Sequence, residues 1–141
     1  MRPSAPDCFF YGVLMDRDVL AAVIGRTVPG ACVRPARLYG YRRVRVEGAV
    51  YPALVAKAGE RVEGVLVRGI AAPEFERLRA FEGEAYVVAE TWVTAIPGGR
   101  TRARLFMPRV PPRASTRAWS PEQWRRRHRA SFLRGIRAGG V

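Results

Sequence analysis

The feature of this sequence that most constrains its fold is a succession of strand-like segments with few helices between them. Short runs rich in Val, Ile, Leu, Tyr and Phe, some alternating with polar residues, are typical of β-strands. Six such runs occupy residues 8–14, 36–48, 49–56, 61–70, 85–96 and 101–108. Helical patterns are predicted only at 16–25, at 73–81 and from Trp119 onward. Because most strands follow one another directly, we expect an α+β protein with a small mixed, largely antiparallel, barrel-like sheet. The helices flank this sheet, one of them C-terminal, and a doubly wound sheet is excluded.

Single residues mark where the predicted elements begin and end. Asp16 is placed to cap the first helix and Gly25 to end it. Pro73 is predicted at the first position of the second helix, and Ser120 as the cap of the last one. Gly64, inside a strand-like run, indicates a bulge or a close approach of another backbone.

The length of the chain limits the number of domains, and its charge limits the possible partners. The chain has 141 residues, which predicts a single domain over residues 1–141. Its net charge of +13 comes from 24 Arg and one Lys against 12 acids, and no Asn occurs, a bias typical of genomic base composition. Residues 1–99 carry 13 basic and 11 acidic groups, whereas residues 100–141 carry 12 and 1. Such a basic segment attracts anions. Nucleic acid is not the expected partner, because no helix-turn-helix, zinc-finger or RNP-type pattern accompanies the charge.

Few residues of the chain are suited to metal, redox or membrane roles. Cys8 and Cys32 form no C-x-x-C pair, and His128 is the single histidine, so neither a metal site nor a cofactor is predicted. The opening "MRPSAPDCFF" lacks the apolar core of a signal peptide, and no apolar run approaches 18 residues. A cytoplasmic location away from membranes is therefore expected.

Two short stretches can carry chemistry. "FFYGVL" places Gly12 in a bend after the first strand, where exposed backbone N–H groups can hold a carboxylate or an oxyanion; an ordinary tight turn is the alternative. "FEGEAYVV" places Glu82 at the end of the second helix, before Gly83. A carboxylate that points inward there would have a raised pKa, which suits a general base or acid; a solvated acid at a helix end is the alternative. Glu84 is expected to point away.

The order of six segments along the chain resembles the gamma-glutamylcyclotransferase-like family, including its plant avirulence-induced branch. The segments are "FFYGVL", "YPALV", "EGVLVRGI", "LRAFEGEAYVV", "ARLFM" and "WSPEQW", and the resemblance covers essentially the whole chain. Their order and spacing carry the resemblance, since no single segment is specific. It implies a small mixed β-barrel flanked by helices.

The resemblance also implies site residues. Glu82 falls on the catalytic glutamate of the family, and no metal or cofactor is implied. The substrate-binding positions fall on Tyr11, Gly12, Val13, Leu14, Tyr51, Pro52 and Tyr86. Val13 is a departure, because the family has Ser or Thr there. If only the backbone N–H is used, Val is tolerated, whereas a hydroxyl that binds substrate would be missing.

The activity that the resemblance implies is a cyclotransferase reaction, an intramolecular acyl transfer that cleaves an amide and that is also classed with lyases. The α-amino group of a γ-glutamyl amine attacks the γ-carbonyl and releases 5-oxoproline and an amine. Two alternatives stay open. Val13 is compatible with a non-catalytic relative that only binds a small metabolite, and the basic C-terminal third with a protein that binds anions or nucleic acid.

Overall fold

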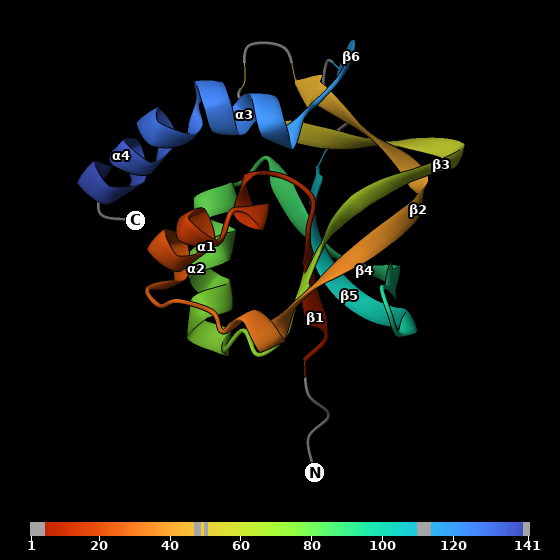
Figure 1. Ribbon diagram of the computed structural model, residues 1–141, viewed down its shortest axis with the longest axis horizontal. Helices are drawn as coiled ribbons and strands as arrows, with labels where there is room; N and C mark the ends of the chain where they lie inside the picture. Colours follow the sequence, from red (N-terminus) through yellow and green to blue (C-terminus); the bar gives the residue numbers. More distant parts are fainter. Residues whose placement is uncertain (1–4, 47–48, 50, 110–113, 140–141) are drawn as a thin grey trace.

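Five strands form one mixed sheet that closes into a barrel (Figure 1). The computed structural model describes residues 5–46, 49, 51–109 and 114–139. Around the barrel the strands are β3 (Pro52–Val67), β1 (Asp7–Phe10), β5 (Gly99–Pro108), β4 (Tyr86–Ala95) and β2 (Val33–Val46), which pairs with β3 again. The pair β1–β5 is parallel, and the other pairs of the ring are antiparallel. The predicted α+β fold with a mixed, largely antiparallel barrel is therefore confirmed.

The inside of the barrel is packed with side chains that alternate along the strands, as the two-residue period of a strand requires. They are Phe9, Tyr11, Ala36, Leu38, Leu54, Val62, Leu66, Val93, Ala95, Ala103 and Leu105. Gly64 of β3 lies directly beneath β1. A Cβ atom there would be 2.5 Å from the carbonyl oxygen of Phe10 and from a ring carbon of Phe9. The close backbone approach predicted at this glycine is confirmed, and it brings β1 and the loop after it onto β3.

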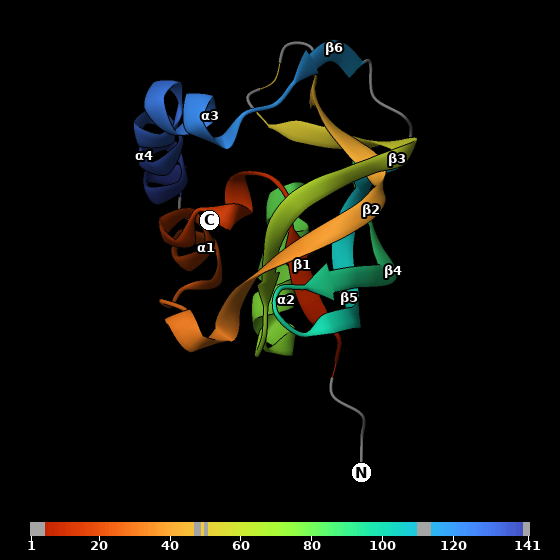
Figure 2. The same cartoon turned by 45° about the vertical axis from the view of Figure 1, so that its right-hand side comes forward.

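Four helices lie on one side of the barrel and enclose a second core (Figures 1 and 2). They are α1 (Arg17–Ile24), α2 (Ala72–Glu82), α3 (Pro121–Arg127) and α4 (Arg129–Gly139). The buried side chains between these helices and the barrel include Phe10, Val19, Leu20, Val23, Ile24, Phe75, Leu78, Trp124, Leu133 and Ile136. Each such side chain contributes about 1.5–3 kcal/mol when it is removed from water. Across the described ranges, no helix is both long and apolar enough to cross a membrane.

The predicted caps hold the helices in place. The Asp16 carboxylate accepts hydrogen bonds from the N–H groups of Asp18 and Val19, at 3.0 and 3.2 Å. Gly25 ends α1 with a left-handed φ of 89°. Asp16 also accepts a hydrogen bond from Nε of Arg129 at 2.6 Å, so the cap of α1 anchors the start of α4. The Ser120 hydroxyl caps α3, accepting from the N–H of Gln123 at 3.3 Å.

Two predicted element boundaries were wrong in the sheet. The strands predicted at 49–56 and 61–70 are replaced by one strand, β3 (Pro52–Val67), because β2 pairs with residues of both segments through a register shift between Tyr39 and Tyr41. The polar residues between the segments resemble a turn, although they continue the strand. The short strand β6 (Ala114–Ala118), which pairs with β2, was not predicted. It lies between the strand predicted at 101–108 and the helix predicted from Trp119, in a stretch whose residues 110–113 lie outside the described ranges.

Two helix boundaries also differ from the prediction. The C-terminal helix is two helices, because the chain leaves the helical conformation at His128, where φ is −126°. Pro73 is the second residue of α2 rather than the first, since Ala72 already belongs to the helix. Both prolines near helix starts, Pro73 and Pro121, remain within the first turn, where a missing N–H leaves no hydrogen bond unmade.

Candidate active site

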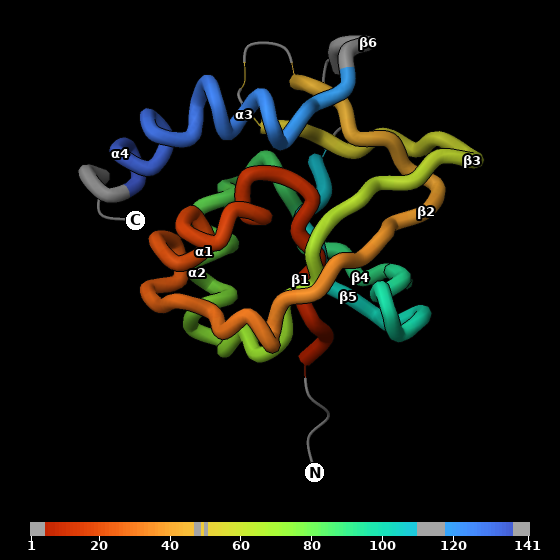
Figure 3. The backbone as a smooth tube through the Cα atoms, in the orientation of Figure 1, coloured from red at the N-terminus to blue at the C-terminus, as the bar shows by residue number. Residues whose placement is uncertain are grey.

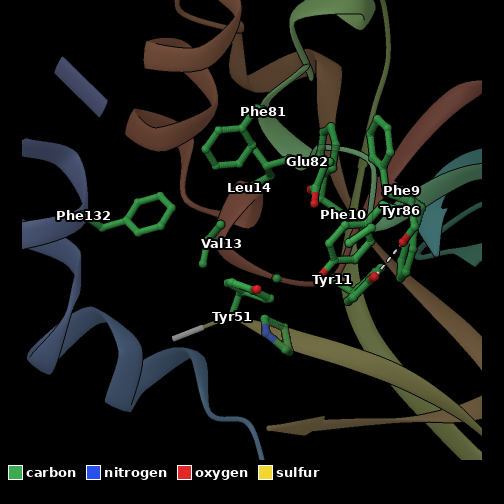
Figure 4. A pocket seen from close by; sticks show the side chains of 14 residues that line it. Phe9, Phe10, Tyr11, Val13, Leu14, Tyr51, Phe81, Glu82, Tyr86 and Phe132 are labelled. Carbon is green, nitrogen blue, oxygen red and sulfur yellow. Dashed lines mark hydrogen bonds between the residues drawn. The ribbon is translucent and has the colours of Figure 1, made fainter. Parts of the chain in front are cut away.

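A pocket of about 330 Å³ lies where β1, the end of α2 and the helix α4 meet (Figure 4). Its lining consists of Phe9, Phe10, Tyr11, Gly12, Val13, Leu14, Tyr51, Pro52, Phe81, Glu82, Ala85, Tyr86, Phe106 and Phe132. All eight residues singled out in the sequence belong to this set, although they come from three separate segments, residues 11–14, 51–52 and 82–86. The structure thus brings them together in one place, and their roles toward a substrate stay predictions.

Six lining residues were missed by the sequence reasoning. They are Phe9, Phe10, Phe81, Ala85, Phe106 and Phe132. Five of them are aromatic residues of strands or helices, and nothing in their spacing separates a cavity wall from an ordinary core position. Phe132 lies on the apolar face of the C-terminal segment, together with Trp124 and Ile136, where the sequence predicts packing rather than a place in a pocket.

Glu82 is the last residue of α2, and its carboxylate points into the pocket (Figure 4). The helix ends there because Gly83 takes a positive φ of 81°, a conformation that L side chains rarely adopt. Burial raises the pKa of Glu82 from 4.5 to about 7. Glu84, two residues later, is exposed and does not line the pocket. Among the lining residues that the structure describes, Glu82 is the single carboxylate, and none is a Lys, Arg or His.

This pKa predicts a stability cost that a substitution can remove. A carboxyl group whose pKa is higher in the folded chain than in the unfolded one favours folding below pH 4.5 and loses that contribution as the pH rises through about 7. We therefore expect Glu82→Gln to be more stable than wild type at pH 8, on the order of 1–3 kcal/mol, and equally stable near pH 4.5. Urea unfolding of both proteins at the two pH values measures the difference. Glu84→Gln is the control, and an equal gain at pH 8 for that variant would contradict the prediction.

Three tyrosines supply hydroxyl groups to the pocket. The Tyr11 hydroxyl donates to the carbonyl oxygen of Phe106 at 2.6 Å. Burial, followed by the charge of Glu82, raises the pKa of both Tyr11 and Tyr86 above the usual value for tyrosine, so both stay protonated at neutral pH. The rings of Tyr51 and Tyr86 meet edge to face, with centroids 6.4 Å apart. Neutral hydroxyl groups beside a carboxyl of raised pKa can hold or pass a proton at neutral pH.

The loop after β1 forms the wall of the pocket that faces α3 and α4. In Figure 3 the red trace after β1 curves beneath the C-terminal helices before it enters α1. Residues Val13–Met15 form one 3-10 turn, η1, in which Gly12 and Val13 accept hydrogen bonds through their carbonyl oxygens. Within the described ranges no protein acceptor meets the N–H groups of Gly12, Val13 or Leu14. The first N–H groups of a helical turn have no hydrogen-bond acceptor within that turn.

The conformation of this loop is fixed from two sides. A Cβ atom on Gly12 would be 3.0 Å from the ring of Pro52, so the loop lies tightly against the start of β3. Behind the loop, Nη1 of Arg43 donates to the carbonyl oxygens of Tyr11 and Glu63, both at 2.9 Å. The Arg43 guanidinium also lies 5.3 Å from the centre of a Trp119 ring, and burial lowers its pKa. Sequence reasoning missed Arg43, because it is one of three arginines at 42, 43 and 45 that nothing distinguishes.

No candidate metal centre was found in the part of the chain that the structure describes. None of its groups of three or more His, Cys, Asp or Glu side chains has an arrangement that could hold an ion. Cys8 is buried and Cys32 half-buried, and both are free thiols. Burial raises the pKa of the Cys8 thiol to about 11, which keeps it protonated.

Comparison with known proteins gives consistent similarities. Residues 8–126 match the profile of the family described as "Gamma-glutamyl cyclotransferase, AIG2-like". Protein AIG2 C from Arabidopsis thaliana is 26% identical over 138 residues, which cover 96% of this chain and 81% of that protein. AIG2-like protein A from the same plant is 27% identical over 128 residues, covering 89% of this chain and 75% of the relative.

Solved structures show the same architecture. The solution structure of an Arabidopsis thaliana protein superposes with a TM-score of 0.71 at 25% identity, covering 97% of this chain and 82% of the other. A solved gamma-glutamyl cyclotransferase superposes with a TM-score of 0.58 at 14% identity, covering 94% and 86%. At that identity the second likeness concerns the fold alone.

Proposed function

Because the chain belongs to the gamma-glutamyl cyclotransferase, AIG2-like family, we propose that it releases 5-oxoproline from a γ-glutamyl amine in the pocket of Glu82. The observation that carries the proposal is the carboxyl of Glu82, whose pKa of about 7 is set by burial in a pocket lined mainly by aromatic and other apolar residues. A group with such a pKa can accept and return a proton at neutral pH. Residues 12–14 of the loop after β1, whose N–H groups meet no acceptor among the described residues, line the same pocket.

The proposed reaction divides its work between substrate and protein. The α-nitrogen of the substrate attacks its own γ-carbonyl carbon, so the nucleophile is already tethered, which lowers the barrier by about 7–11 kcal/mol when it is well oriented. Glu82 first removes a proton from the α-ammonium group. A new C–N bond forms, and the carbonyl oxygen becomes an oxyanion that needs hydrogen-bond donors.

Collapse of this intermediate breaks the original amide bond. The protonated Glu82 gives its proton to the leaving nitrogen as the C–N bond breaks. The ring nitrogen loses its second proton, and the departing amine takes up the equivalent proton from water. The products are 5-oxoproline and an alkyl ammonium ion, so no atom of water enters the 5-oxoproline.

The loop at residues 12–14 is the proposed donor for either the oxyanion or the substrate α-carboxylate. In this role Val13 is sufficient, because its N–H is used and no hydroxyl is required. Arg43 is a positioning residue for this loop. The carbonyl of Tyr11 and the N–H of Gly12 belong to one peptide group, and a guanidinium on the carbonyl makes that N–H a stronger donor. A positive charge behind the wall of the pocket thus strengthens a donor in that wall.

We expect Arg43→Met to lower kcat/KM by about 10-fold to 100-fold, the worth of one hydrogen bond to a charged group. A loss in kcat would assign the Gly12 N–H to the oxyanion, and a loss in KM would assign it to the carboxylate. The neighbouring Arg42, about 40% exposed and paired with Glu60, provides the control variant Arg42→Met. If Arg43→Met lowers the melting temperature but leaves kcat and KM unchanged below it, Arg43 has only a structural role.

The proposed function is tested with a panel of γ-glutamyl amides. The leaving amines are an amino acid, the ε-amino group of lysine, a dipeptide, an alkyl amine and an arylalkyl amine, and chromatography measures 5-oxoproline and glutamate. Release of 5-oxoproline from at least one member, above the rate without enzyme, is expected. If none is released while 5-oxoproline itself binds, the chain is a metabolite-binding relative. Val13, which replaces the hydroxyl residue of the family, is the observation that favours this second function.

A further inference from the structure

The pocket offers little that could hold a charged leaving group. Two aromatic pairs flank it. The rings of Phe81 and Phe132 meet edge to face with centroids 6.0 Å apart, and Tyr51 and Tyr86 form the second pair. Figure 4 shows Phe132 reaching from α4 toward Val13, on the side of the pocket away from Tyr11 and Tyr86. On this side Tyr51 is the polar side chain drawn beside Val13, and none of the labelled residues there carries a charge.

A γ-glutamyl substrate needs the polar groups of the pocket for its glutamyl part. The α-ammonium group must lie at the carboxylate of Glu82, and the carboxylate and carbonyl oxygens must meet donors such as the loop N–H groups. The leaving nitrogen is bonded to the carbon under attack, so the first atoms of the leaving amine also lie inside the pocket. What remains to contact them is the apolar part of the lining, which includes Val13, Phe81 and Phe132.

The charge of the leaving amine then determines how favourably that amine binds to the apolar part of the pocket. A carboxylate on that amine, as in an amino acid or a peptide, would enter a lining whose described residues include no Lys, Arg or His, and it would lie near the carboxylate of Glu82. A second ammonium group would be taken from water, and the one carboxylate of the lining is already engaged with the α-ammonium. Unpaired charges are expensive to bury. An uncharged alkyl or aryl group exchanges water for aromatic surface instead.

We propose that the leaving group is an uncharged, apolar amine, alkyl or arylalkyl, and that Phe132 of the C-terminal helix is the residue that selects it. This inference rests on the proposed function. Phe132 is held in position by Phe81 and by Trp124, whose ring lies 5.6 Å from its own, edge to face. The C-terminal helices therefore complete the substrate site in addition to closing the core.

The test compares two substrates on three proteins. The substrates are γ-glutamylbenzylamine, with an apolar leaving group, and γ-glutamylglycine, with a free carboxylate on the leaving group. The proteins are wild type, Phe132→Ala and the control Tyr39→Ala, whose aromatic ring is 53% exposed and lies outside the pocket. We expect wild type to prefer the benzylamide by at least about 10-fold in kcat/KM, the discrimination that an apolar pocket can supply.

Phe132→Ala should reduce kcat/KM for the benzylamide by about 10-fold or more and leave that for γ-glutamylglycine within about threefold, so that the preference is lost. Phe132→Leu should keep most of the preference, which separates lost apolar contact from a disturbed fold. An equal or better kcat/KM for γ-glutamylglycine in wild type overturns the inference, as does an equal loss for both substrates in Phe132→Ala.

Failure of this inference is distinguishable from failure of the proposed function. A chain that releases 5-oxoproline but prefers γ-glutamylglycine keeps the function and loses the inference. If neither substrate is turned over, calorimetry of the two amides compares their affinities directly. Tighter binding of the benzylamide, reduced in Phe132→Ala, then still supports an apolar subsite, and equal or reversed affinities overturn it.

Discussion

Glu82→Gln is expected to lose turnover of γ-glutamyl amides by roughly 10²–10⁴-fold, the usual worth of a positioned general acid or base. Gln has the size of Glu and can form hydrogen bonds, but it does not accept a proton at neutral pH. The variant should therefore fold and bind 5-oxoproline as wild type does. Initial rates of 5-oxoproline release, together with calorimetric binding of the product, measure both expectations.

The matched control for this experiment is Glu84→Gln. Gly83 separates the two carboxylates, and Glu84 is exposed outside the pocket lining. Its activity should stay within a few-fold of wild type. In wild type, kcat/KM should rise as the pH rises through about 7, because Glu82 must lose its proton to act as the base. An active Glu82→Gln, or an inactive Glu84→Gln, would show that the wrong carboxylate has been assigned.

The largest expected effect on stability comes from Trp124→Ala, which should lower the free energy of unfolding by about 3–5 kcal/mol. Trp124 of α3 is only 4% exposed and belongs to the core between the helices and the barrel. Its removal leaves a cavity that α1 and α4 cannot fill without moving. Denaturant unfolding followed by circular dichroism gives the difference.

Arg126→Ala is the control for the same helix, because its side chain is exposed. We expect this change to alter stability by less than about 0.5 kcal/mol. Together the two variants separate the apolar face of the C-terminal segment from its charge. A loss below 1 kcal/mol for Trp124→Ala would mean that the segment is an appendage of the barrel, and the interpretation of its arginines as an anion-binding surface would gain support.

The sequence predicts the class of fold well because strand and helix patterns are local. The alternation of polar and apolar residues along β4 and β5, and the caps Asp16 and Ser120, depend on neighbours a few residues away. The bulge that joins the two halves of β3 depends instead on the pairing with β2, a partner in a different part of the chain. Local sequence patterns contain no information about that pairing. They therefore predict two strands where the structure has one.

The candidate site also has a part that local sequence patterns predict and a part that depends on contacts between distant segments. Glu82 and the loop at Gly12 follow from short motifs that end an element, where glycine has a local reason to occur. The aromatic wall at Phe132 and the support of the loop by Arg43 arise from contacts between segments about 50 and 30 residues apart. An arginine among 24, or a phenylalanine on an amphipathic helix, carries no local mark of such a contact.

The central claim is that this pocket cleaves a γ-glutamyl amide by cyclisation, and one measurement tests it most directly. Wild type is incubated with a γ-glutamyl amine in water enriched in ¹⁸O, and mass spectrometry identifies the acid that is released. The proposed mechanism predicts 5-oxoproline that carries no ¹⁸O, in an amount equal to the free amine and far above that formed with Glu82→Gln. Glutamate that carries ¹⁸O would show hydrolysis by water and would contradict the account.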